Sequence, residues 1–169
     1  MKQTFAIGCV TENENEYYVQ VGKHNLQTAV DLQLSNPPVS INRLSKINEE
    51  DTIDEICLII LDLTKWFNVK NNISETQLYS LASMIMNEYK HLNLLDLGIC
   101  FKFAKLGKYG KVYDRLDGGL ILEWLNRYDA DKTEIIVNRR LQQNNEYKGD
   151  NTTRSSETTL KKALKKWDN

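Results

Sequence analysis

Between residues 48 and 67, apolar side chains recur at steps of three and four residues, which is the period of one face of an α-helix. The recurring positions are Ile53, Ile56, Cys57, Ile60, Leu61, Leu63, Thr64 and Phe67. Asn48 can cap the first turn, and residues 49–51 are acidic, as the positive end of a helix dipole favours. The sequence therefore predicts one long, largely buried helix, against which the rest of the chain has to pack.

More helices are predicted after residue 73. Ser74 and Gln77 have the spacing of a capping box, and the helix that they open has an apolar side made of Leu78, Leu81, Ala82, Ile85, Met86 and Tyr89. After a break at residues 91–93, the next helix is expected to bury Leu94, Leu97, Cys100, Phe101 and Ala104, with Leu106 as a further candidate. Asp117 can cap a helix through Leu120, Ile121, Trp124, Leu125 and Tyr128, and Asp129 or Asp131 can restart it toward Arg139 and Arg140. We expect a mainly α fold with a compact helical bundle over residues 48–141.

The first 47 residues have a different sequence pattern from the predicted bundle. Residues 4–10 and 17–21 are β-branched and aromatic, and the polar stretch 11–16 lies between them. This pattern predicts an N-terminal β-hairpin over residues 1–24, and a disordered arm is the alternative. Residues 25–47 are expected to form a connector with a short helix near residues 26–32 and an extended stretch at Pro37 and Pro38.

The last 28 residues are predicted to form a linker and a tail. Residues 142–156 are rich in Gln, Asn, Thr and Ser, which favours a flexible linker. Residues 157–169 then form a basic amphipathic tail helix, with Leu160, Ala163, Leu164 and Trp167 on one face. We expect the tail to bind a partner, and the alternative is a helix docked on its own domain. The predicted partner-binding residues are Lys161, Lys162, Leu164, Lys165, Lys166 and Trp167.

The charge is divided unevenly along the chain. The formal net charge is only −1, so no global field indicates a nucleic-acid or membrane partner. Residues 139–169 nevertheless hold eight Lys and Arg against four Asp and Glu, while the residues before them hold 14 against 19. The sequence contains no apolar run of the roughly 18 residues that a membrane span needs, and its start lacks the apolar run of a signal peptide. We therefore expect a cytoplasmic protein with no membrane partner.

The residue types that carry most catalysis are scattered. Cys9, Cys57 and Cys100 lie far apart without metal-ligand spacing, and we interpret them as reduced core residues. His24 and His91 have no second His or Cys at ligand spacing, which favours surface or capping roles. The sequence also lacks the common catalytic motifs. We therefore predict no enzymatic activity, no cofactor and no metal site.

The loop after residue 101 concentrates positive charge. Lys102, Lys105, Lys108 and Lys111 recur at every third position, Arg115 follows, and Tyr109 and Tyr113 lie among these cations. Lysines can neutralise phosphates and tyrosines can stack on bases, so we predict a nucleic-acid-binding site here. Its residues would be Lys105, Lys108, Tyr109, Lys111, Tyr113 and Arg115. The alternative is a solvated helix end, where lysines satisfy the last carbonyl groups.

A pattern between residues 74 and 128 carries a resemblance to known proteins. Its most distinctive part is Gly-x-Tyr-Gly-x-x-Tyr-x-x-x-Asp-Gly at residues 107–118, and its other segments are 74–77, 85–89, 94–97, 101–105 and 121–128. With the apolar pattern around them, over about residues 50–135, the chain resembles a group of short helical proteins carried by Bacteroidota phages and mobile elements. The resemblance implies a phage or mobile-element origin, a bacterial host cell and an all-helical central domain, but no activity. The layout of body, linker and tail is also similar to that of small phage helicase loaders.

These inferences lead to one expected function and one alternative. We expect a non-enzymatic phage or mobile-element accessory protein that binds DNA, a replication protein or both, as a helicase-loader-like adaptor would. The alternative is a virion or anti-defence protein that acts purely through protein–protein interaction, with the hairpin and the tail as its docking elements.

Overall fold

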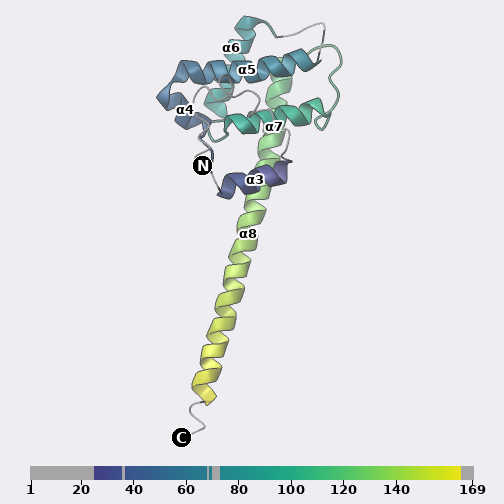
Figure 1. Ribbon diagram of the computed structural model, residues 1–169. Coiled ribbons are helices and arrows are strands. Elements are labelled where there is room, and N and C mark those ends of the chain that lie inside the picture. Colours follow the sequence, from purple (N-terminus) through teal and green to yellow (C-terminus); the bar gives the residue numbers. More distant parts are fainter. Residues whose placement is uncertain (1–24, 36, 68, 70–72, 165–169) are drawn as a thin grey trace. The chain divides into compact units, whose positions relative to one another are not determined.

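The structure of the protein is a computed structural model that describes residues 25–35, 37–67, 69 and 73–164 (Figure 1). Within these ranges the chain forms helices and no β-strand, so the prediction of a mainly α fold is confirmed. The helices are α3 (Leu26–Ser35), α4 (Ile41–Ile47), α5 (Glu49–Phe67), α6 (Glu75–Glu88), α7 (Leu94–Lys105) and α8 (Gly118–Leu164). The predicted β-hairpin lies outside the described residues. No described helix combines the length and the apolar character that crossing a membrane requires.

The chain divides into two units at Lys132. The first unit contains α3 to α7 and the part of α8 that ends at Lys132. The second unit begins at Thr133, and its described part is the remainder of α8.

Helix α5 organises the first unit, as its apolar period predicts. It packs against α4, α6 and α7. Its buried residues are Thr52, Ile53, Glu55, Ile56, Ile59, Ile60, Leu63 and Thr64. Ser74 and Gln77 form the predicted capping box at the start of α6. The apolar sides expected for α6 and α7 are buried as well, except that Leu106 lies just after the end of α7 and is 72% exposed.

The segment predicted as a connector belongs to the core. Leu26, Ala29 and Val30 of α3 and Ile41 and Leu44 of α4 are all buried. Each of these groups has helical spacing, so the two short helices have an apolar side that packing can use. The backbone N–H of Ile41 also donates to the carbonyl of Leu92 at 2.8 Å, which fixes α4 to the α6–α7 turn. The compact unit therefore begins before residue 48.

Helix α8 is longer than predicted. Asp117 caps it, because its carboxylate accepts the backbone N–H of Leu120 at 2.9 Å. The helix then continues through Asp129 and Asp131 without a restart and through residues 142–156, where the sequence favours a linker. This segment contains no proline, and Gly149 is its one glycine, so no residue in it removes a backbone donor.

Candidate functional site

The structure gives the six predicted nucleic-acid-binding residues quite different surroundings. Lys111, Tyr113 and Arg115 lie in the exposed loop between α7 and α8, and 77% of the Tyr113 side-chain surface is exposed. Tyr109 is instead buried, with 8% exposure. Gly107 and Gly110 adopt φ angles of 76° and 109°, a backbone conformation that suits glycine and shapes the turn around Tyr109. The tyrosine ring therefore has no free face for a base, and its predicted stacking role is corrected.

Buried Tyr109 lies against a thiol. The Tyr109 hydroxyl has no conventional hydrogen-bond partner among the described residues and adjoins the side chain of buried Cys100. Burial raises the pKa of the tyrosine, and the nearby thiol raises it further. Burial also raises the pKa of Cys100, which keeps the thiol protonated and unreactive. This pair is therefore part of the core, as the sequence analysis predicts for Cys100.

Carboxylates accompany most of the cations in this cluster. Lys105 pairs with Asp62 of α5, and its ammonium group lies 5.5 Å from the centre of the Trp66 ring. Lys108 pairs with Asp131 at 3.2 Å. Arg115 pairs with Asp117 at 3.1 Å, although the arginine is largely exposed. A phosphate would have to compete with these acids, so the cluster is a weaker anion site than its sequence suggests.

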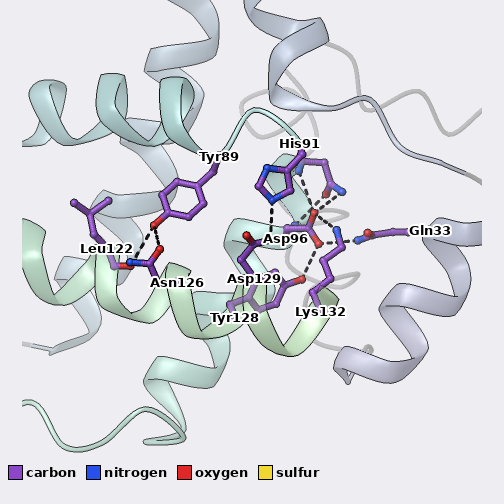
Figure 2. Close-up of polar contacts among 10 residues, drawn as sticks. Gln33, Tyr89, His91, Asp96, Leu122, Asn126, Tyr128, Asp129 and Lys132 are labelled. Atoms are coloured by element: carbon purple, nitrogen blue, oxygen red, sulfur yellow. Dashed lines mark hydrogen bonds and ion pairs between the residues drawn. The ribbon is translucent and has the colours of Figure 1, made fainter. Parts of the chain in front are cut away.

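The most extensive polar cluster was not predicted. It is centred on Asp96 of α7, a fully buried residue whose carboxylate accepts hydrogen bonds from four other residues (Figure 2). Oδ1 accepts from the Gln33 amide at 2.9 Å and the Tyr128 hydroxyl at 2.6 Å. Oδ2 accepts from Lys132 Nζ at 2.6 Å, and from the backbone N–H and side-chain amide of Asn93 at 3.1 and 2.7 Å. One acid thus completes the capping box that Asn93 opens at the start of α7, and it joins this helix to α3 and α8.

The Asp96 cluster is closed to other molecules. Lys132 is 8% exposed, and its charge is opposite to that of the carboxylate that it contacts. Burial raises the pKa of Tyr128, and the negative charge of Asp96 raises it further, so the hydroxyl remains a donor. Both carboxylate oxygens are already occupied by donors. This arrangement suits a structural role better than catalysis, because no atom of the acid is left for a substrate.

Further polar contacts surround the same part of α8 (Figure 2). The Tyr89 hydroxyl lies 2.8 Å from the Asn126 side-chain oxygen. His91 Nε2 and Asp129 Oδ1 lie 2.7 Å apart, so exposed His91 pairs with a half-buried acid of α8. These contacts fix the rotation of residues 118–132 of α8 within the first unit. In the sequence, Asp96 is signalled only as an isolated acid in the apolar run from Leu94 to Phe101.

An open groove of about 620 Å³ lies between α6 and the first turn of α8. Its lining includes the charged residue Arg115 and four apolar residues, Leu81, Met84, Leu116 and Leu122. Across the described ranges, no group of three or more His, Cys, Asp or Glu side chains could hold a metal ion. The groove is a surface that could receive an apolar group, and it has no reactive centre among its lining residues.

The predicted tail residues are only partly described. Lys161, Lys162 and Leu164 belong to α8, whereas Lys165, Lys166 and Trp167 lie outside the described residues. The helical backbone agrees with the predicted tail helix as far as Leu164. Its role in partner binding stays a prediction.

The geometry can be set against known proteins. Comparisons with protein-family models, curated proteins and solved structures give no match. The resemblance to phage proteins therefore stays a prediction.

The buried tyrosines predict how stability depends on pH. In the unfolded chain Tyr109 and Tyr128 ionise near pH 10, whereas in the folded protein their raised pKa values keep them protonated. The folded state then binds more protons than the unfolded state, so the free energy of unfolding falls as pH rises above 10. For each tyrosine the slope grows above pH 9 and approaches about 1.4 kcal/mol per pH unit near pH 11, where the phenol of the unfolded chain is almost fully ionised. Urea unfolding between pH 8 and 11 measures it, and Tyr128→Phe should reduce the slope. A slope that is the same in both proteins would contradict the prediction.

Proposed function

We propose that this protein is a small non-enzymatic adaptor, and that the second unit of α8 is its main partner-binding element. The observation that supports this proposal is that the described part of the second unit, residues 133–164, is a single helix. A single helix has no second element against which to bury a face. A partner surface can supply that packing.

The residues of this helix support the proposal. Val137 and Leu141 are 47% and 54% exposed, and they lie four positions apart on one side. Residues 142–159 contain Tyr147 as their one large apolar residue. Burial of side chains within this chain alone therefore stabilises the helix little. An isolated helix of this kind is marginal in water, because most helical stability in proteins comes from packing. Binding then adds the missing contacts, which offset the entropy cost of ordering the helix.

Charge indicates what the partner presents. Residues 139–169 carry a net charge of +4, with four of the lysines at positions 161–166. A partner with an acidic surface and an apolar groove would complement both these lysines and the apolar side chains Leu164 and Trp167. A replication protein of a phage or mobile element, in the bacterial cytoplasm, is the partner class that we propose. A virion or host-defence protein with the same surface chemistry is the alternative.

Direct DNA binding is the second candidate. It is favoured by the loop between α7 and α8, where Lys111, Tyr113 and Arg115 are exposed. Lys111 has no carboxylate partner among the described residues. This leaves a smaller cationic surface than the sequence suggests, because Tyr109 is buried and Lys105 and Lys108 are paired. We therefore rank DNA below a protein partner.

A photo-crosslinking experiment tests the adaptor proposal. A photoreactive amino acid is placed at Val137 or Leu141 of the full chain in the native host cell. The expected result is a crosslink to one acidic protein from both positions, since the proposed partner covers this face of the helix. Tyr79 of α6 is the matched control, because it is 51% exposed but lies in the first unit, and it should give no such crosslink.

The contradicting result is equally specific. It would be the absence of a protein crosslink from either position, together with salt-dependent binding of a labelled DNA duplex that Lys111→Glu weakens. Because each phosphate contact adds to the salt dependence, Lys111→Glu should then also flatten it. That outcome would favour the DNA-binding function over the adaptor function.

A further inference from the structure

The outward face of α5 carries a second regular pattern. Its core side is buried, whereas the opposite side presents Asp51, Asp54, Leu58, Leu61 and Lys65. The two acids and the lysine are exposed, Leu58 is half-buried, and Leu61 is 37% exposed. These positions are separated by three, four, three and four residues, which is the spacing of a coiled-coil seam. We call this set the α5 seam.

The α5 seam is free of internal partners where the structure describes the chain. Its charged residues form no ion pair with other described residues. Neighbouring Asp62 is different, because it is already paired with Lys105. The seam therefore offers two leucines, with two uncompensated acids toward the N-terminal end of the helix and one uncompensated lysine toward the C-terminal end.

We propose that a second copy of this chain docks on the α5 seam, with the two α5 helices antiparallel. In that alignment Leu58 of each copy meets Leu61 of the other, because one register brings both pairs together. In an antiparallel pair of identical helices, the numbers of the two residues that meet always add up to the same value. Residues 54 and 65 give the same sum as residues 58 and 61, so this register also places Asp54 of each copy against Lys65 of the other. Two apolar layers are then flanked by two layers of opposite charge, and both copies use the same surface, as a two-fold dimer requires.

The charges select this arrangement over others. A parallel dimer would place Asp54 on Asp54 and Lys65 on Lys65, which costs free energy through like-charge contact. A nucleic acid would meet Asp51 and Asp54 with its phosphates, which disfavours it as the occupant of this face. A second copy is complementary at every layer from residue 54 to residue 65.

The dimer should be weak and sensitive to salt. Two leucines from each copy form a small apolar centre, and the interface is expected to be smaller than the about 1,200 Å² below which complexes are usually transient. The flanking ion pairs are partly exposed, so raising the ionic strength weakens them. Association should therefore become visible only as the protein concentration rises.

Sedimentation equilibrium of the full chain from about 5 to 500 µM tests the proposal. The wild type is expected to pass from monomer to dimer. Asp54→Lys and Lys65→Asp should each weaken dimerisation about tenfold, because each places like charges together twice. A 1:1 mixture of the two variants should regain the affinity of the wild type, since every charged layer in the mixed dimer again joins Lys to Asp. Glu88→Lys, which reverses an exposed acid on α6, is the control and should have no effect.

Three results would overturn the proposal. They are a wild type that remains monomeric throughout, single variants that dimerise as the wild type does, or a mixture that stays monomeric. Circular dichroism establishes whether each variant is folded. If a charge-reversal variant unfolds, Leu61→Gln provides the same test, because it removes both apolar layers without changing charge. An unchanged affinity in that variant would place the association on another surface.

Discussion

Replacing Asp96 by alanine is expected to lower the free energy of unfolding by about 3–5 kcal/mol, because it leaves a buried charge without its partner. The Lys132 ammonium and the Tyr128 hydroxyl both donate to this carboxylate, and both are buried. Neither finds another acceptor once the acid is gone, and the capping box of α7 loses the bond that the backbone N–H of Asn93 donates to this carboxylate. Urea unfolding followed by circular dichroism measures the change. Asp131→Ala is the control, since Asp131 pairs with Lys108 at the surface and should cost less than about 1 kcal/mol.

A double substitution distinguishes the effect of the unpaired charge from the effect of lost packing. Combining Asp96→Leu with Lys132→Met removes both charges together and keeps apolar volume in their place. A buried ion pair replaced in this way is often neutral or stabilising, so the double variant should recover much of the loss. If Asp96→Ala is no more harmful than Asp131→Ala, the cluster does not support the fold in the way that its geometry indicates.

Shortening α8 is expected either to leave the free energy of unfolding almost unchanged or to prevent folding, depending on where the chain ends. A chain that ends at Val137 keeps the whole first unit, with one turn of helix beyond Lys132, and should unfold with nearly the wild-type free energy. A chain that ends at Asn126 lacks Tyr128 and Lys132 and should not fold, because Asp96 would be buried without its two strongest donors.

Thermal unfolding followed by circular dichroism distinguishes the two shortened chains. The expected results are a cooperative transition for the longer chain and no transition for the shorter one. Cooperative unfolding of the chain that ends at Asn126 would mean that the core is complete without the last turns of α8 in the first unit. Loss of the transition in the chain that ends at Val137 would mean that the two units depend on each other for stability.

Local signals account for what the sequence predicts correctly. The caps at Ser74 and Asp117 depend on residues three positions away, and the apolar sides of α5, α6 and α7 follow from a period of a few residues. Such features are visible along the chain because the partners are close in sequence. The predicted starts of α6 and α8 therefore agree with the structure.

Long-range contacts account for what the sequence could not predict. Asp96 meets Gln33, Tyr128 and Lys132 across separations of 63, 32 and 36 residues. The sequence around Tyr109 predicts an exposed aromatic residue among lysines. Gly107 and Gly110, however, allow a turn in which the tyrosine is buried. Leu61 fits the apolar period of its helix and still lies 37% exposed, because the apolar residues of α5 cover more than its core side and Leu61 lies with Leu58 on the opposite side.

The position of Asp96 also constrains the order in which the protein can fold. Its bonds to Asn93 are local and can form as soon as α7 does, whereas those to Gln33 and Lys132 must wait for distant segments. During synthesis the carboxylate stays hydrated until the ribosome has released the chain beyond residue 132. The acid therefore becomes buried only after Lys132, its last partner along the chain, has reached it.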